Sequence, residues 1–126
     1  KALVLGTGGA SMAVQYVLKE LKIEFLLVSR RKNFVSCILY PDLNKKIYED
    51  HTLLINTTPL GMFPNVNECP PLPYQYLTKN HLLFDLIYNP TETLFMKKGK
   101  EKKAVVVNGL EMLHHQAEES WRIWNS

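Results

Sequence analysis

The stretch Lys1-Ala-Leu-Val-Leu-Gly-Thr-Gly-Gly-Ala-Ser11 decides the fold of this 126-residue chain. Apolar residues 2–5 predict a short strand, glycines stand at positions 6, 8 and 9, and a helical pattern begins at position 10. A strand that turns through glycines into a helix brings backbone N–H groups and the positive end of the helix together, where a diphosphate can bind. Because a glycine-rich turn can also be purely structural, the rest of the chain decides between the two interpretations.

Composition and charge fit one globular domain. The chain is 46% hydrophobic and 21% charged, and its formal charge of +3 is too small and too scattered to indicate a nucleic-acid partner. The dense basic run at 97–103 is typical of a solvated helix end. No apolar run approaches the ~20 residues of a membrane span, and no signal peptide is visible. Cys37 and Cys69 lie outside any CxxC pattern and predict reduced thiols in a cytoplasmic protein.

Short apolar runs alternate with helical patterns, which is typical of an α/β fold. Five prolines between positions 59 and 73 predict a long ordered loop. The predicted fold is a Rossmann-type, doubly wound, parallel six-stranded sheet in the order 3-2-1-4-5-6, with helices on both faces. Strands are predicted at 2–5, 25–28, 35–39, 52–56, 82–86 and 104–107, and helices at 10–21, at 42–48 with Asp42 as N-cap, at 91–98 with Gly99 as terminator, and at 110–124.

The turn after the first strand is the predicted diphosphate site. In such sheets ligands bind beyond the carboxyl ends of the strands. Gly6 permits the tight turn, and Gly8 lets the backbone approach a diphosphate without an intervening Cβ. Ser11 replaces the third small residue of the usual fingerprint, so the motif is a variant. The residues predicted to hold the diphosphate are Gly6, Thr7, Gly8, Gly9 and Ala10.

The turn after the second strand reads Ser29-Arg30-Arg31-Lys32. An NAD-binding unit normally places a carboxylate here for the ribose 2′-OH. Three cations stand in its place, and a 2′-phosphate carries about −1.5 to −2 charges. The cluster therefore predicts NADP as the cofactor, with a solvated basic turn as the alternative.

No metal site is predicted. His114 and His115 point in different directions on the predicted last helix and have no further ligand at the required spacing. Trp121 and Trp124 recur at helical spacing and are predicted to be packing anchors. Asp85, at the end of a strand, is interpreted as a structural acceptor rather than a catalytic base.

Three later motifs make the chain recognisable. They read Asn56-Thr57-Thr58-Pro59-Leu60-Gly61-Met62, Asp85-Leu86-Ile87-Tyr88-Asn89-Pro90, and Asn108-Gly109-Leu110-Glu111-Met112-Leu113 followed by Gln116-Ala117. Together with residues 6–10, these motifs resemble the C-terminal, NADP-binding domain of shikimate dehydrogenase. The resemblance covers essentially the whole chain.

This resemblance implies reversible, NADPH-dependent reduction of 3-dehydroshikimate to shikimate, a cytoplasmic step of aromatic amino-acid (chorismate) biosynthesis. Residues 1–126 would form the NADP-binding domain of a two-domain dehydrogenase. The catalytic Lys and Asp of the family belong to an N-terminal domain that this chain lacks, so the chain would hold no catalytic residue and be inactive alone. It would share its small-molecule substrate with that domain, and a homodimer is left open.

The resemblance also assigns roles to single residues. Thr58 would lie along the cofactor, the main chain near Leu86 and Gly109 would face the nicotinamide, and Met112 would pack against that ring. Tyr88 and Gln116 would recognise the substrate's hydroxyl and carboxylate groups. By spacing alone, Tyr88 is also interpretable as a half-buried aromatic residue and Gln116 as an exposed helix residue. Ser29 stands where the family usually has Asn.

Two alternative functions remain. Within the enzyme class, related dehydrogenases act on quinate, and similar cofactor domains occur in methylene-tetrahydrofolate dehydrogenase and glutamyl-tRNA reductase. Outside it, the absence of a self-contained acid and base favours a non-catalytic NADP-binding module.

Overall fold

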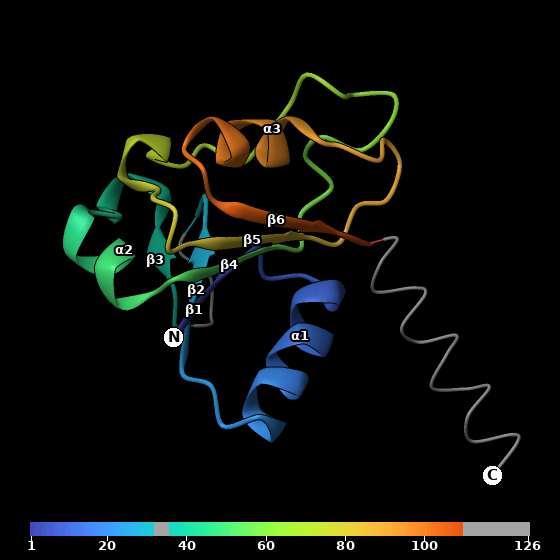
Figure 1. The fold of residues 1–126 in the computed structure, drawn as a ribbon. Coiled ribbons are helices and arrows are strands. Elements are labelled where there is room, and N and C mark those ends of the chain that lie inside the picture. The colour runs from blue at the N-terminus through green and yellow to red at the C-terminus, as the bar shows by residue number, and fades with distance from the viewer. Residues whose placement is uncertain (32–35, 110–126) are drawn as a thin grey trace, which may run out of the picture.

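The computed structural model describes residues 1–31 and 36–109, which fold around one sheet (Figure 1). The strand order is β3-β2-β1-β4-β5-β6, and every neighbouring pair runs parallel. The predicted strand order and fold class are therefore confirmed. The strands are β1 (Ala2–Leu5), β2 (Phe25–Ser29), β3 (Ile38–Leu39), β4 (Leu53–Asn56), β5 (Leu82–Asp85) and β6 (Val105–Asn108).

Helices lie on both faces of the sheet, as predicted. Figure 1 shows α1 (Gly9–Glu20) on one side and α3 (Leu94–Glu101) on the other, and α2 (Lys45–Asp50) precedes β4. Residues 57–73, all described, form the predicted long loop without helix or strand. The helix predicted at 110–124 lies outside the described residues. Within the described ranges, no helix is long and apolar enough to cross a bilayer.

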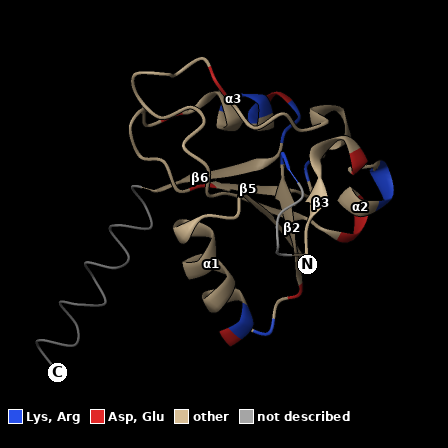
Figure 2. Cartoon of the chain, turned by 180° about the vertical axis from the view of Figure 1, so that it is seen from behind, with Lys and Arg blue, Asp and Glu red and all other residues tan. Residues whose placement is uncertain are grey.

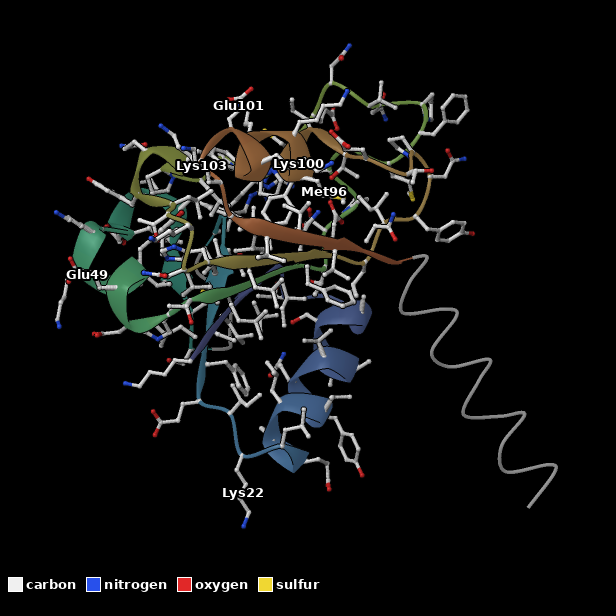
Figure 3. The ribbon with its side chains drawn as sticks, viewed as in Figure 1. Lys22, Glu49, Met96, Lys100, Glu101 and Lys103 are labelled. Atoms are coloured by element: carbon white, nitrogen blue, oxygen red, sulfur yellow. The ribbon has the colours of Figure 1, made fainter. Side chains whose placement is uncertain are left out.

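Strand β1 is buried on both of its faces. Leu3 and Leu5 pack into the cluster beneath α3 that includes Met96, which is labelled in Figure 3. The alternate residues Ala2 and Val4 pack on the α1 side. This is the two-residue period of a strand, and its uninterrupted apolar sequence is what a covered parallel strand requires.

The register aligns three polar residues at the carboxyl ends of neighbouring strands. Asn56 of β4 pairs with Asp85 of β5, which pairs with Asn108 of β6. All three side chains are buried. Buried polar groups require hydrogen-bond partners, so this row is positioned to organise the loops that leave the sheet.

The prediction for residues 42–48 was wrong about where the helix begins. Asp42 closes a 3₁₀ turn, Tyr40–Asp42, and α2 starts only at Lys45. The N-cap is Asn44, whose side-chain oxygen accepts the N–H of Ile47 at 2.9 Å. Asp and Asn are both favourable N-cap residues, so residue type alone does not distinguish Asp42 from Asn44. The path of the backbone places Asn44, and not Asp42, at the start of the helix.

Gly99 does not end α3, contrary to the prediction. The helix continues to Glu101, and Lys103, at φ 63°, makes the turn that follows; Figure 3 labels both residues. A Cβ at position 99 would lie 2.7 Å from Cδ2 of Leu83 and 3.1 Å from Cγ1 of Val106. Glycine is therefore required here because α3 closely approaches β5 and β6.

We expect Gly99→Ala to destabilise the domain. Alanine gains about 0.5–1 kcal/mol of helix propensity, whereas overpacking typically costs about 1–3 kcal/mol. We expect the second effect to dominate because Leu83 is fully buried. Urea unfolding should show a lower midpoint for Gly99→Ala. A midpoint equal to or above that of the wild type would show that α3 can shift freely on the sheet.

Candidate cofactor site

The bend after β1 requires glycine. Gly6 has φ +110°, and its N–H donates to the carbonyl of Val28 at 2.8 Å. A Cβ on Gly6 would lie 2.7 Å from Oγ1 of Thr57, the hydroxyl that donates to the carbonyl of Leu5 at 2.6 Å. The predicted tight turn at Gly6 is confirmed.

Gly8 and Gly9 meet no such restriction from the protein. A Cβ on either residue would have no heavy atom within 4 Å, and neither residue has a positive φ. Gly8 is the N-cap of α1, and no side chain caps this helix end. Because the fold does not demand these glycines, they leave space at the positive end of α1 that suits a close anionic ligand.

A hollow of about 470 Å³ lies at this helix end, where β1, β2 and β4 finish. It joins the glycine turn to the basic turn after β2 and to the loop after β4. Within the described ranges, no carboxylate lines it. The lining residues are Gly6, Thr7, Gly8, Ser29, Arg30, Arg31, Tyr40, Thr57, Thr58, Pro59 and Leu60.

Arg30 and Arg31 supply the positive charge of this hollow. The hydroxyl of Ser29 accepts the N–H of Arg31 at 3.3 Å, which stabilises the turn that presents both side chains. Both arginines are exposed, and neither forms a salt bridge with a described residue. The two guanidinium groups are thus available to an anion, while Lys32 lies outside the described residues.

Tyr40 forms a wall of the hollow that the sequence did not reveal. It is buried and contributes to the core as well as to the lining. Burial raises the pKa of Tyr40 to about 12, and the nearby charge of Arg30 opposes this shift. The phenol is therefore neutral at physiological pH and does not neutralise Arg30.

A second hollow, of about 440 Å³, adjoins the first and shares Thr57, Thr58 and Pro59 with it. It brings together four residues predicted from distant motifs: Ala10, Thr58, Leu86 and Tyr88. Tyr88 is 61% exposed, so it is not a core residue. The other lining residues are Met62, Phe63, Ile87 and Asn89.

Asn56 and Asp85 form a buried hydrogen-bond network that reaches Thr58, a residue that lines both hollows. The side-chain oxygen of Asn56 accepts the N–H of Thr58 at 3.0 Å and its hydroxyl at 2.6 Å. The amide nitrogen of Asn56 donates to Asp85 at 3.2 Å. The network therefore holds Thr58 in the wall that the hollows share.

Asp85 extends this network to the turn after β5 and to α3. Its Oδ1 accepts the N–H of Ile87 at 3.0 Å, and its Oδ2 accepts the hydroxyl of Thr93 at 2.7 Å. The oxygen of Thr93 in turn accepts the N–H of Met96 and caps α3. The interpretation of Asp85 as a structural acceptor fits these contacts, whereas the positioning roles of Asn56 and Thr93 were missed.

Burial raises the pKa of Asp85, and the hydrogen bonds from Thr93, Ile87 and Asn56 oppose this shift. The folded protein thus binds the Asp85 proton more tightly than the unfolded chain does. The stabilisation that follows is complete below the unfolded pKa of about 4 and is lost as pH rises through the folded pKa.

We therefore expect the stability difference between the wild type and Asp85→Asn to depend on pH. The free energy of unfolding of the wild type, minus that of the variant, should fall as pH rises from about 4. Urea unfolding of both proteins from acidic to neutral pH measures it. A difference that rises with pH would mean that Asp85 is stabilised as a carboxylate.

Gly109 lies directly beside Leu86, and the resemblance had assigned the main chain of both residues to the nicotinamide. Its N–H donates to the carbonyl of Ile87 at 3.2 Å, and a Cβ on it would overlap the carbonyl oxygen of Leu86. Glycine is therefore needed for this close approach of two chain segments. Met112 and Gln116, the other predicted residues of this motif, lie outside the described residues.

The described part of the chain offers few metal-ligating or charged groups at the site. No group of three or more His, Cys, Asp or Glu side chains there could hold a metal ion. The residues that line the second hollow include no charged side chain. The described site therefore offers surfaces for binding and orientation, and Tyr88 is its one ionisable side chain beside the second hollow.

The parallel sheet, the glycine bend at its carboxyl edge and the uncapped α1 define a Rossmann-type domain of the dinucleotide-binding class. No family model matches the chain. Its sequence is similar to shikimate dehydrogenase (NADP(+)), with 38% identity over 135 residues to the protein of Methanococcus aeolicus, a match that covers 97% of this chain and 48% of that protein. The chain thus spans about half the length of the curated relatives it matches.

Comparison with solved structures also shows similarity to shikimate dehydrogenase. Shikimate 5-dehydrogenase from Thermus thermophilus, in complex with NADP(H) and shikimate, is 29% identical with a TM-score of 0.77, over 98% of this chain and 48% of that one. The 5-ketofructose reductase of a Gluconobacter strain is 26% identical with a TM-score of 0.81, over 98% and 50% of the two chains. The resemblance to shikimate dehydrogenase is confirmed, and the second match shows that the architecture is shared by a reductase of another substrate.

Proposed function

We propose that this chain is the NADP-binding half of a two-domain, NADP-dependent shikimate dehydrogenase. The observation that carries the proposal is the first hollow, where the glycine bend meets Arg30 and Arg31, and where no carboxylate from the described ranges lines the space or pairs with either arginine. The reaction transfers a hydride from NADPH, with a proton, to the carbonyl of 3-dehydroshikimate, giving shikimate and NADP⁺. The free thiols of Cys37 and Cys69 suit the cytoplasm.

The described residues fit the cofactor at both ends. Gly8 and Gly9 leave space for a diphosphate at the start of α1, with Gly6, Thr7 and Ala10 completing the turn. Arg30 and Arg31, supported by Ser29 and joined by Lys32, would bind the 2′-phosphate. When bound, the cofactor supplies or accepts the hydride.

The second hollow is the proposed place of the nicotinamide and of part of the substrate. Thr58, held by Asn56, and the main chain of Leu86 beside Gly109 would face the ring. We assign Met112 to packing against it. Exposed Tyr88 at the rim, together with Gln116, would contact the hydroxyl and carboxylate groups of the substrate.

Among the described residues, Tyr88 is the one ionisable side chain that lines the second hollow, and we assign it to substrate contact rather than to proton transfer. Reduction of a carbonyl needs an acid that meets the developing alkoxide, positioned within hydrogen-bond reach. No charged group lines the second hollow in the described ranges. We therefore assign the catalytic Lys and Asp to the other half of the enzyme, which corresponds to the part of the relatives that this chain does not cover.

We expect the 126-residue chain to bind NADP but to show no appreciable turnover of shikimate. A longer protein from the same gene, with the upstream half included, should oxidise shikimate with NADP⁺. The absorbance of the NADPH that forms measures shikimate oxidation by each of the two proteins. Robust oxidation by the short chain alone would contradict the division of roles, and a longer protein that prefers quinate would move the substrate assignment to the related dehydrogenases.

A further inference from the structure

Tyr40 stands beside Arg30 at one edge of the sheet. Strand β3 pairs with β2 so that Leu39 lies opposite Ser29, and Tyr40 and Arg30 are the residues that follow in the two segments. Figure 2 shows β2 and β3 side by side, and β3 is an edge strand. Neighbouring strands lie about 4.8 Å apart, so the two residues leave the sheet at nearly the same place.

Tyr40 and Arg30 are shared by two hollows. Both line the first hollow, and both also line a third hollow of about 600 Å³, whose other walls include Pro41, Pro71 and Tyr76. Within the described ranges, no carboxylate lines either space, and Arg30 is the one charged side chain of the third hollow. An anionic group bound by Arg30 would therefore have Tyr40 as its neighbour.

The hydroxyl of Tyr40 is accessible although its ring is buried. Tyr40 as a whole is only 5% exposed. In the described part of the chain, its hydroxyl has no hydrogen-bond partner, and the one fully buried side-chain oxygen or nitrogen without a partner is the hydroxyl of Tyr48. The Tyr40 oxygen must therefore be reached from a hollow that the residue lines. The charge of Arg30 acts on this phenol, because it opposes the rise in the Tyr40 pKa that burial causes.

The threonine hydroxyls that follow β4 are already used by the protein. Thr57 donates to the carbonyl of Leu5 at 2.6 Å, and Thr58 donates to the side-chain oxygen of Asn56 at 2.6 Å. A hydroxyl has one proton to donate, so neither residue can give a second hydrogen bond to an anion. Tyr40 has no acceptor among the described residues, and its proton is available to a ligand.

The protein also holds the Tyr40 ring in place. The ring belongs to the core cluster that contains Leu43 and Tyr48. The carbonyl of Tyr40 accepts the N–H of Leu43 at 3.2 Å, in the 3₁₀ turn that includes Pro41. An exposed arginine loses conformational freedom when it binds a ligand, whereas a buried ring has already lost it on folding. A hydrogen bond from Tyr40 is therefore preorganised.

We propose that Tyr40 is a specificity-determining residue of the cofactor site, whose hydroxyl donates a hydrogen bond to the 2′-phosphate of NADP beside the Arg30 guanidinium. A phosphate group offers three strong acceptor oxygens, so the phenol and the guanidinium can bind different oxygens of the same group. NAD has no phosphate at this position, so the contact favours NADP. This inference rests on the proposed function and adds a neutral donor to the arginines already assigned.

Tyr40→Phe removes only the hydroxyl and keeps the ring in the core, so its midpoint of urea unfolding should match that of the wild type. Calorimetric titration of the 126-residue chain should show roughly ten-fold weaker binding of NADP⁺ and nearly unchanged binding of NAD⁺. The matched control is Tyr48→Phe, which removes a buried hydroxyl that lines neither hollow. This control should bind both dinucleotides as the wild type does.

The Arg30→Gln background separates a direct contact from an effect through the arginine. Tyr40→Phe should weaken NADP⁺ binding further in that background, and no further loss would mean that Tyr40 only positions Arg30, which overturns the inference. Wild-type NADP⁺ affinity in Tyr40→Phe, or an equal loss for NAD⁺, would also overturn it and leave the proposed function intact. A wild-type chain that binds NADP⁺ no better than NAD⁺ would instead contradict the proposed function, and this inference with it.

Discussion

Replacing Arg30 and Arg31 together by glutamine is expected to abolish the preference of this chain for NADP over NAD. One charge-assisted hydrogen bond contributes about 1.5–3 kcal/mol, which is roughly ten- to a hundred-fold in affinity. Neither guanidinium is paired with a described carboxylate, so each is available to the 2′-phosphate. NADP affinity should therefore fall at least about ten-fold, while NAD affinity, which does not use this phosphate, should stay nearly constant.

Calorimetric titration of wild type and variant with both dinucleotides measures this effect. The matched control is the double variant Lys45→Gln and Lys79→Gln, which removes two exposed positive charges outside the hollow. It should retain the wild-type preference at moderate salt. If the control loses as much NADP affinity as the arginine variant, attraction by net charge rather than a defined phosphate contact is responsible.

The second large effect concerns the glycine bend, where two neighbouring substitutions should have different consequences. Gly6→Ala forces a side chain into φ +110°, at a cost of about 1–3 kcal/mol. Its Cβ would also displace the hydroxyl of Thr57 from the carbonyl of Leu5, which leaves a polar group unpaired and costs about 1–3 kcal/mol more. Against a total stability of about 5–15 kcal/mol, this is a severe loss.

Gly8→Ala should leave folding nearly unchanged, because its Cβ would have no protein atom within 4 Å. The same Cβ would occupy the space where we place the diphosphate, so NADP affinity should fall roughly ten- to a hundred-fold. Urea unfolding and NADP titration of both variants separate the two effects. A Gly8→Ala variant that binds NADP as well as the wild type would place the diphosphate elsewhere.

The sequence predicted the architecture because the fold is encoded locally. The all-apolar run of β1 and the glycines after it identify a covered parallel strand that leads into a helix, and the right-handed crossover rule then leaves few strand orders. The basic turn at Arg30 could be recognised for the same reason, since its place after β2 determines which part of a ligand it meets.

The features that were missed depend on distances between segments. Asn56 and Asp85 read as separate polar residues until the register places them side by side. Gly99 reads as a helix terminator until the closeness of Leu83 is known. Tyr40 joins the hollow only through the path of the chain after β3. The one signal in the sequence that could have revealed the network of Asn56 and Asp85 is that each of these strands ends in a polar residue.

The most direct test of the central claim is a crystal structure of this chain with bound NADP⁺. The account predicts the diphosphate against the backbone N–H groups of Gly8 and Gly9 at the start of α1. It also predicts the 2′-phosphate within hydrogen-bond distance of the Arg30 or Arg31 guanidinium. Dinucleotide density outside this hollow, or a 2′-phosphate that points away from both arginines into solvent, would contradict it.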